Sequence, residues 1–254
     1  DVYNPATDTW ETIAAPRVPT PFAASHVQSA SDGQFVWVVG GFEGQHPGTP
    51  TVNSWQYDTV NDLWQAGPPL PAPRASGAVV RHDRTLHYIS GLTNDRNTDQ
   101  VEHYTLDIDD PLATWQLAPP MPQARNHMQG VALGDYIYVI GGQFRHDVGP
   151  VDVALVHRYD TTTQQWERLA DLPQPRSHFE TGTFTYNGRL FAVGGRNNQN
   201  NLRAMETIVE YNPQTATAQE IGGRNLNDYC YSVANFDLRM NNEADTLIAI
   251  RRID

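Results

Sequence analysis

The chain has 254 residues, of which 39% are hydrophobic and 18% are charged, a composition that fits one globular domain and excludes an intrinsically disordered chain. The formal net charge of −12 argues against a general grip on nucleic acid, and no run of about 18 apolar residues is present to insert into a bilayer. The single cysteine, Cys230, excludes an internal disulfide framework and a CxxC metal knuckle.

A sequence motif in two halves recurs about every 50 residues along the chain. Its first half is a tyrosine, a short turn and a tryptophan, found in chain order at Tyr3 to Trp10, Tyr57 to Trp64, Tyr104 to Trp115 and Tyr159 to Trp166. A fifth copy starts at Tyr211 and carries Ala218 where tryptophan is expected.

The second half of the motif is an apolar strand that ends in a glycine pair or a Ser-Gly pair. It occurs at 35–41, 86–91, 136–142 and 190–195, and a fifth copy at 247–250 is followed by Arg251 and Arg252 in place of the glycines. Proline-rich turns, such as 70–74, 121–125 and 172–176, separate the two halves and would break a helix. Short apolar runs between turn signals therefore predict an all-β fold.

This motif resembles the kelch repeat, in which a glycine pair, a tyrosine and a tryptophan mark one four-stranded blade of a β-propeller. The resemblance covers nearly the whole chain and extends to bacterial secreted kelch proteins. Glycines let strand and loop backbones approach closely, and the aromatic rings fill the wedge between blades.

The terminal segments decide the number of blades. The chain begins in the tyrosine-tryptophan half of one repeat and ends in the strand half of another, with four complete repeats between them. We expect a single domain over residues 1–254, in which the half-blade 1–20 pairs with the half-blade 224–254 to close a five-bladed ring without free sheet edges. The alternative is a fragment of a larger propeller, because kelch proteins more often have six or seven blades.

The first strand of each blade lines the central channel of a propeller, so equivalent residues of all blades face one another. Counting along the repeats places His26, Ser76, His127, His178 and Cys230 at one level of the channel. Imidazoles and a thiolate are ligands for zinc or copper, so we predict that His26, His127, His178 and Cys230 hold one metal ion. The alternative is that the histidines satisfy backbone groups at the strand starts.

Two neighbouring levels of the channel supply further candidates. The level after the histidines holds Gln28, Ala78, Gln129, Glu180 and Ser232, and the level before them holds Ala24, Arg74, Arg125, Arg176 and Asp228. Gln129 and Glu180 are predicted to contact a ligand. The alternative is that these polar residues simply line a water-filled channel.

The arginines Arg74, Arg125 and Arg176 are predicted to form a ring at the channel mouth that attracts an anion, because guanidinium geometry suits a carboxylate. The resemblance implies the same, since kelch-type substrate adaptors capture acidic peptides with arginine at this place, and 74–77 is similar to that motif. The alternative is that the arginines pair with nearby acids such as Asp228 or Glu180.

One loop adds a sixth ligand-binding candidate. His146 and Asp147 follow the glycine pair of the third repeat, in a loop where kelch proteins often place binding residues. Asp95 and Arg96 occupy the corresponding loop one repeat earlier. We expect these loops to wall the same pocket, and the alternative is that they are simply solvated.

These residues favour a recognition propeller that binds an acidic glycan or an acidic peptide at an Arg/His-lined channel mouth, with a bound copper or zinc ion as an option. An alternative is a carbohydrate-active enzyme, either a uronate-polysaccharide lyase or a sialic-acid-type epimerase, because bacterial proteins similar to kelch include such epimerases. In that case His127 or His178 would abstract a proton and Tyr229 or Tyr231 would donate one.

A weaker alternative is a copper-dependent oxidase, because galactose oxidase carries a kelch-like propeller and Tyr229-Cys230-Tyr231 lies beside the predicted histidine ring. Neighbouring residues of a strand point to opposite faces, which argues against a Tyr-Cys crosslink here. The chain opens with Asp1 rather than methionine, so a removed export signal is consistent with it and we expect an extracellular or periplasmic location.

Overall fold

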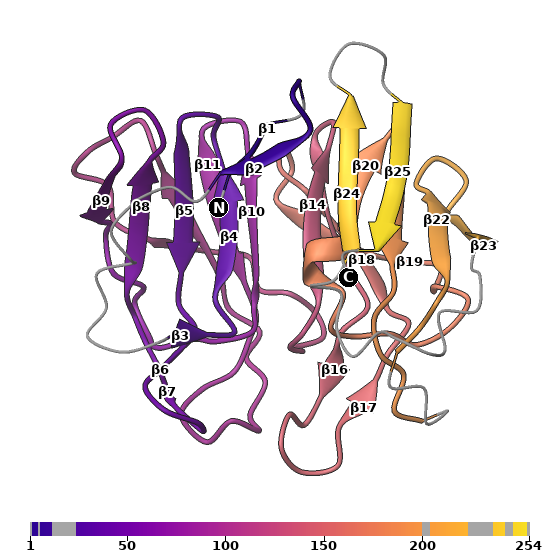
Figure 1. The fold of residues 1–254 in the computed structure, drawn as a ribbon. Helices are drawn as coiled ribbons and strands as arrows, with labels where there is room; N and C mark the ends of the chain where they lie inside the picture. The colour runs from indigo at the N-terminus through magenta and orange to yellow at the C-terminus, as the bar shows by residue number, and fades with distance from the viewer. Residues whose placement is uncertain are drawn as a thin grey trace.

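Four four-stranded antiparallel sheets stand around a common axis in the computed structural model, which describes residues 2–4, 6–11, 24–199, 204–222, 236–241 and 246–252 (Figure 1). The first two sheets consist of β4 (Gln28–Ser31), β5 (Phe35–Val39), β8 (Ser54–Asp58) and β9 (Leu63–Ala66), and of β10 (Ala78–His82), β11 (Thr85–Ile89), β12 (His103–Asp107) and β13 (Gln116–Ala118). The other two consist of β14 (Gln129–Leu133), β15 (Tyr136–Ile140), β18 (Val156–Asp160) and β19 (Gln165–Leu169), and of β20 (Thr183–Tyr186), β21 (Arg189–Val193), β22 (Ile208–Asn212) and β23 (Thr217–Gly222).

The first strand of each sheet lines the axis, as predicted. Strand β10 contacts both β4 and β14, and β14 contacts β20. Each sheet then runs outward from the axis in chain order. The described helical structure is one 3-10 turn, η1 (Glu180–Gly182), directly before β20. The prediction of an all-β propeller is therefore confirmed.

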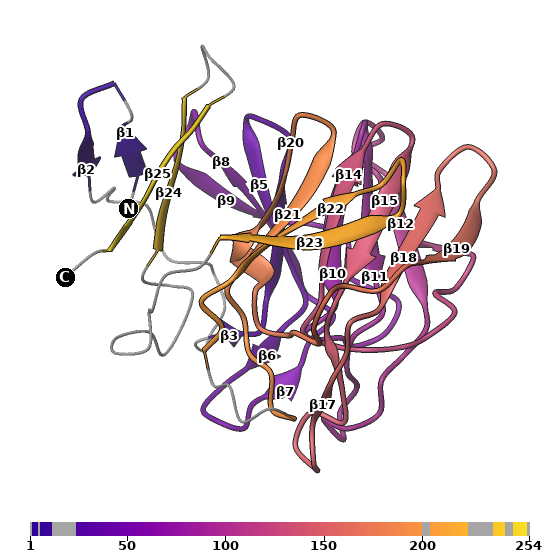
Figure 2. The ribbon, with the colours of Figure 1, turned by 90° about the vertical axis from the view of Figure 1, so that its right-hand side faces the viewer.

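Two hairpins stand at the ends of the chain. Strand β1 (Val2–Asn4) pairs with β2 (Thr9–Glu11), and β24 (Phe236–Asn241) pairs with β25 (Thr246–Arg252). Figures 1 and 2 place both hairpins on the side of the molecule between the first and fourth sheets, where a fifth blade would stand. Within the described residues they form two separate two-stranded sheets, so the closing fifth blade stays a prediction.

Short strands extend the lower end of the axis in Figure 1. Strand β6 (Phe42–Glu43) pairs with β3 (Ala24–Ser25) and β7 (Thr49–Pro50) in a three-stranded sheet, and β16 (Gln143–Phe144) pairs with β17 (Val151–Asp152). Strands β6, β7, β16 and β17 follow the glycine pairs of the first and third sheets, whereas β3 precedes β4, so these strands lengthen the connections at this end.

The hydrophobic core lies in three layers between neighbouring sheets. In β11, Leu86 and Tyr88 pack against the first sheet, whereas Ile89 packs against the third. In β15, Val139 packs against the second sheet and Ile140 against the fourth. Both faces of β11 and β15 are thus buried, which explains why these two strands are almost continuously apolar in sequence.

The tryptophan of the repeat links one sheet to the next. The indole N–H of Trp115 donates to the carbonyl oxygen of Pro68 at 2.9 Å, and that of Trp166 donates to Pro119 at 2.8 Å. Both bonds reach back 47 residues, into the turn of the preceding sheet. The fourth sheet has Ala218 at this position, which has no side-chain donor, so its junction with the third sheet lacks the link.

The glycine pair allows two sheets to meet backbone to backbone. Gly141 has a φ of 58°, and a Cβ atom there would lie 2.5 Å from the carbonyl oxygen of Arg176. The N–H of Gly142 donates to the same oxygen at 2.8 Å. In the second sheet Ser90 replaces the first glycine, and its Oγ donates to the carbonyl of Arg125 at 2.8 Å. In the second sheet a hydrogen bond from the serine hydroxyl therefore joins the two sheets at the position where the other repeats have a glycine.

Two buried histidines face the third sheet from the second. His87 Nδ1 lies 2.8 Å from His103 Nε2, and His103 Nδ1 lies 3.3 Å from the carbonyl oxygen of Pro119. Because the carbonyl can only accept, His103 carries its proton on Nδ1 and accepts the N–H of His87 on Nε2. Burial lowers the pKa of His87 to about 3 and that of His103 to about 4, so both rings are neutral at pH 7.

This pair predicts a loss of stability in mild acid. The unfolded chain binds a proton on each ring below a pKa of about 6.5, whereas the folded chain binds it only near pH 3 to 4. The free energy of unfolding should therefore fall as the pH drops from about 6.5 towards 4, by up to about 1.4 kcal/mol per pH unit for each ring. Urea denaturation at several pH values measures this slope. The double variant His87→Leu/His103→Phe should have a shallower slope, and an unchanged slope would contradict the assignment.

Candidate functional site

Main-chain hydrogen bonds join four equivalent residues in a row around the lower end of the axis, which we call the backbone ring. The N–H of Ser76 donates to the carbonyl of His26 at 3.1 Å, that of His127 to Ser76 at 3.0 Å, and that of His178 to His127 at 3.4 Å. All four have positive φ angles, between 48° and 58°. The structure thus places these residues at one level of the channel, as their spacing predicts. Cys230, the fifth predicted member, lies outside the described residues.

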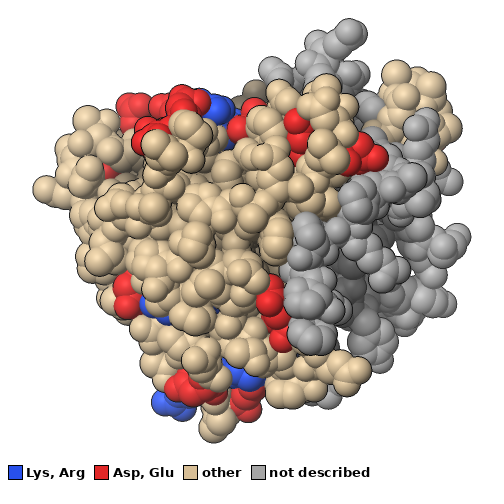
Figure 3. Space-filling view, turned by 90° about the vertical axis from the view of Figure 1, so that its left-hand side faces the viewer, with Lys and Arg blue, Asp and Glu red and all other residues tan. Residues whose placement is uncertain are grey.

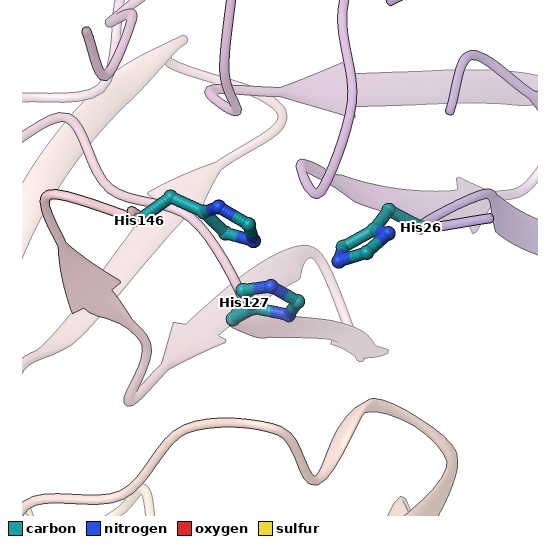
Figure 4. A group of neighbouring side chains, drawn as sticks. All are labelled: His26, His127 and His146. Carbon is teal, nitrogen blue, oxygen red and sulfur yellow. The ribbon is translucent and has the colours of Figure 1, made fainter. Parts of the chain in front are cut away.

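Four imidazoles cluster on this ring, because His146 reaches it from the loop after β16. The ring centroids of His26, His127 and His146 are 5.0, 5.1 and 5.3 Å apart, and Figure 4 shows the three rings around a common space. Their nearest nitrogen atoms all lie within 4.8 Å of one another. His178 stacks on the other side of the cluster, with its centroid 3.7 Å from that of His127.

The Nδ1 atom of each clustered imidazole has its own oxygen partner. His127 Nδ1 lies 2.8 Å from Glu180 Oε1, and His146 Nδ1 lies 2.6 Å from Asp147 Oδ1. His26 Nδ1 lies 3.0 Å from its neighbour's hydroxyl, the Oγ of Ser25. These contacts fix the ring orientations and leave Nε2 as the atom that each ring offers to a ligand.

The cluster is uncharged at neutral pH. Burial, and after it the neighbouring imidazoles, lower the pKa of His26 to about 4 and that of His178 to about 2. Burial also holds the pKa of His127 well below its usual range and lowers that of His146. The Glu180 carboxyl is buried beside them, and its pKa is raised. Neutral imidazoles keep their lone pairs, so they can accept a proton or bind a metal.

The three predicted arginines occupy buried positions inside the blades. Arg74, Arg125 and Arg176 are 3%, 0% and 0% exposed. Arg125 donates from Nε to the carbonyl of Gly141 at 2.6 Å and from Nη2 to that of Val139 at 3.1 Å, and Arg176 donates from Nη1 to Gly194 at 2.8 Å. This placement differs from the predicted open ring at the channel mouth. For Arg125 and Arg176 the carbonyls near the glycine pair offer the guanidinium a fixed buried site. Arg74 instead pairs with Glu102 at 3.1 Å and donates to the carbonyl of Pro73 at 2.8 Å, so all three arginines are held within the blades.

The remaining predicted residues divide into two groups. Gln129, at the start of β14, is partly buried and its Oε1 has no hydrogen-bond partner among the described side chains, while Glu180 binds His127 as given above. The proposed proton donors Tyr229 and Tyr231 lie outside the described residues, as does Cys230. No structural contact therefore bears on the copper oxidase alternative.

Two further arginines flank the histidines: Arg96, from the loop predicted to wall the same pocket, and Arg196, which the sequence-based predictions do not include. Arg96 donates from Nε to Asp147 at 2.6 Å and lies 4.0 Å over the ring of Phe42. Arg196 donates from Nη2 to the amide oxygen of Gln143 at 2.8 Å. Both guanidinium groups lower the pKa of His127, which reflects their proximity. Arg196 directly follows the glycine pair of the fourth sheet. This place in the repeat is the sequence feature from which it could have been predicted as a site residue.

Charge is distributed unevenly between the two ends of the strands. On the face shown in Figure 3, acidic side chains predominate along the upper edge, with a basic group among them, and acidic and basic side chains lie together in the lower half. The short strands that flank the histidine cluster also lie low in Figure 1. Among the described residues, no helix has the length and apolar character needed to cross a membrane.

Comparison with known proteins confirms the kelch-repeat resemblance. The sequence model described as Kelch motif matches residues 124–173. The chain is 28% identical over 215 residues to a kelch repeat-containing protein of Arabidopsis thaliana, covering 77% of the chain and 49% of the relative. It is 28% identical over 195 residues to Kelch-like protein 35 of Mus musculus, covering 76% and 30%.

A fungal relative and a solved structure agree with this result. Kelch-like protein terF of Aspergillus terreus is 28% identical over 200 residues, with 74% of the chain and 43% of the relative covered. The structure of YjhT matches with a TM-score of 0.70 at 14% identity, covering 87% of this chain and 74% of that one, which supports the fold alone. The chain spans less than half the length of each of these three curated relatives.

Proposed function

We propose that this chain, a kelch-repeat β-propeller, is a recognition module that binds a carboxylate-bearing partner, an acidic glycan or peptide, at the end of the axis where the histidines cluster. Kelch repeats generally form protein-interaction propellers. The observation that carries the proposal is the guanidinium of Arg196 at this end, whose Nε–H is buried without a hydrogen-bond partner among the described residues. A buried donor left unpaired costs about 1–3 kcal/mol, which a ligand with acceptor atoms recovers.

The acidic side chains at this end are already bound by the protein. Asp147 is held by Arg96 and His146, and Asp152 accepts a hydrogen bond from Ser177 Oγ at 2.5 Å. Among the described residues Arg196 donates to a neutral amide, through the Nη2 contact described above, and the charges of Asp152 and Glu180 act on it from farther away. Its guanidinium is therefore the cation that this end offers to a carboxylate, and a charged hydrogen bond is the strongest polar contact that such a ligand can make.

A calorimetric titration with a uronate oligosaccharide and with an oligoglutamate peptide tests the proposal. We expect saturable binding of one of these probes, which Arg196→Gln should weaken by at least about tenfold because a charged hydrogen bond is lost. The matched control is Arg189→Gln on β21, which removes the same charge from a surface pair with Glu210 and should leave the affinity unchanged. Equal losses in both variants, or no binding of either probe, would contradict the proposal.

One contact favours an enzyme as the second candidate function. In the His127–Glu180 pair the carboxylate holds Nδ1, which leaves Nε2 to take a proton, as in a general base. A uronate lyase or a sialic-acid-type epimerase could use this arrangement on an acidic sugar. The same titration mixtures decide between the candidates, because a lyase would generate the ultraviolet absorbance of an unsaturated uronate, and a recognition module would leave the probe intact.

A further inference from the structure

We infer that His26, His127 and His146 form a three-histidine binding site for one zinc ion, with a fourth position open to solvent or to a ligand. This inference goes beyond the proposed recognition function, because it requires no acidic partner. It also differs from the set expected from the sequence, since His146 takes the place given there to His178.

The three ligands come from separate segments that the fold brings together. His26 lies between β3 and β4, His127 directly before β14, and His146 in the loop after β16. Their imidazoles form a nearly equilateral triangle, as the centroid separations above show, and Figure 4 shows that the rings enclose one space. In a tetrahedral site with a Zn–N distance of about 2.0–2.1 Å, the ligand nitrogens lie about 3.4 Å apart. The three nitrogens already lie within 4.8 Å, so small side-chain rotations close them on the ion.

The contacts around the triangle resemble the outer shell of a zinc site. A zinc-binding histidine usually donates its other ring N–H to a carboxylate or another oxygen, which fixes the tautomer and raises the basicity of the ligand. His127 has Glu180 in this role, His146 has Asp147 and His26 has the hydroxyl of Ser25. All three partners bind Nδ1, so the same nitrogen, Nε2, is free on every ring.

One of these nitrogens has no other explanation in the described structure. The side chain of His127 is 7% exposed, and its Nε2 is buried without a hydrogen-bond partner among the described residues. A polar atom in that state is costly unless something binds it. A metal ion at the centre of the triangle satisfies this nitrogen and the matching atoms of the other two rings together.

The loop that supplies His146 is held in place on both sides. Asp147 receives Arg96 Nε at 2.6 Å, and its own N–H donates to Asn97 Oδ1 at 3.0 Å. His146 is thus positioned before any ion arrives, which lowers the entropic cost of binding. His178 has a different role: it stacks on His127, and its Nδ1 lies 2.7 Å from Ser177 Oγ, so it supports the ligand ring from behind.

The test is a zinc titration of the chain after metal removal with a chelator, read by competition with a chromophoric chelator and without any acidic ligand. We expect one zinc ion per chain. Co²⁺ in its place should give the visible absorption bands of a tetrahedral site. His146→Gln should weaken zinc binding by about 100-fold or more, and Asp147→Asn by about tenfold through the loss of the outer contact.

Two variants serve as controls. His178→Gln should retain zinc affinity within a few-fold, whereas it would abolish binding if His178 were a ligand. His82→Gln removes a histidine that binds the carbonyl of Gly134 at the other end of the strands, and it should leave the titration unchanged. The near-ultraviolet circular dichroism of each variant verifies its fold. The inference is overturned if the chain binds no zinc, or if His146→Gln binds it as tightly as the unmodified chain. Because no acidic ligand is present, either result leaves the proposed recognition function standing.

Discussion

Replacing Arg125 by alanine should lower the free energy of unfolding by at least about 3 kcal/mol. The guanidinium is fully buried and donates to three backbone carbonyls, those of Gly141, Val139 and Gln123, with His157 Nδ1 at 3.1 Å. Alanine would remove the donor from these acceptors and leave a cavity at a position that is fully buried. Urea denaturation followed by tryptophan fluorescence measures the change.

The matched control for Arg125 is Arg81. It also donates to two carbonyl oxygens, Ser31 at 2.8 Å and Asp83 at 2.9 Å, but these bonds lie at the surface. Water replaces them when the side chain is removed, so Arg81→Ala should change the free energy of unfolding by only about 0.5 kcal/mol. Similar losses in the two variants would show that burial of the repeated arginine contributes little.

The second large effect is expected for Gly141→Ala, at about 3 kcal/mol or more of lost stability. A methyl group there would lie 2.5 Å from the carbonyl oxygen of Arg176 and 2.6 Å from the ring of Phe179. Neither neighbour can move freely, because the oxygen accepts the N–H of Gly142 and Phe179 is fully buried. The two sheets would have to separate at the junction where they meet most closely.

Gly134→Ala isolates this steric effect from backbone strain. Gly134 has a φ of 57°, almost the same as the 58° of Gly141, but nothing lies within 4 Å of the Cβ position. Its substitution should therefore cost only the strain of a left-handed alanine, about 1 kcal/mol. The difference in unfolding free energy between the two variants measures the close approach alone. A difference near zero would mean that the sheets adapt to the methyl group.

The repeat was sufficient to predict the fold and the axial level of the site. Both follow from sequence spacing. Counting residues from each glycine pair identifies His127 and His178 as residues that lie just before the axis-lining strand of their sheets. The bonds between successive backbones on the ring show that this counting places His26, Ser76, His127 and His178 correctly. The number of blades depends on the two chain ends, which share no repeat unit, and it stays a prediction.

Spacing could not reveal which way a side chain turns or where a loop returns. Arg125 occupies the predicted place in its repeat, but its side chain turns into the blade because unpaired carbonyls lie there. His146 belongs to a loop without a fixed register, so the sequence could assign it to a binding loop and not to the histidine triangle. Arg196 has a fixed place directly after the glycine pair of the fourth sheet, but spacing alone does not show that its side chain turns toward the histidines.

The backbone ring on the axis has a consequence for how such a site can change. Each of its hydrogen bonds joins main-chain atoms, so the ring persists whichever side chain stands at a given position, provided that the residue tolerates a left-handed conformation. Ser76 demonstrates this, because it holds the same place as three histidines with the same geometry. β-branched residues are disfavoured there, but histidine, asparagine, serine and glycine are interchangeable as far as the scaffold is concerned. Ligand chemistry can therefore diverge at this level, one position at a time, while the architecture is inherited intact.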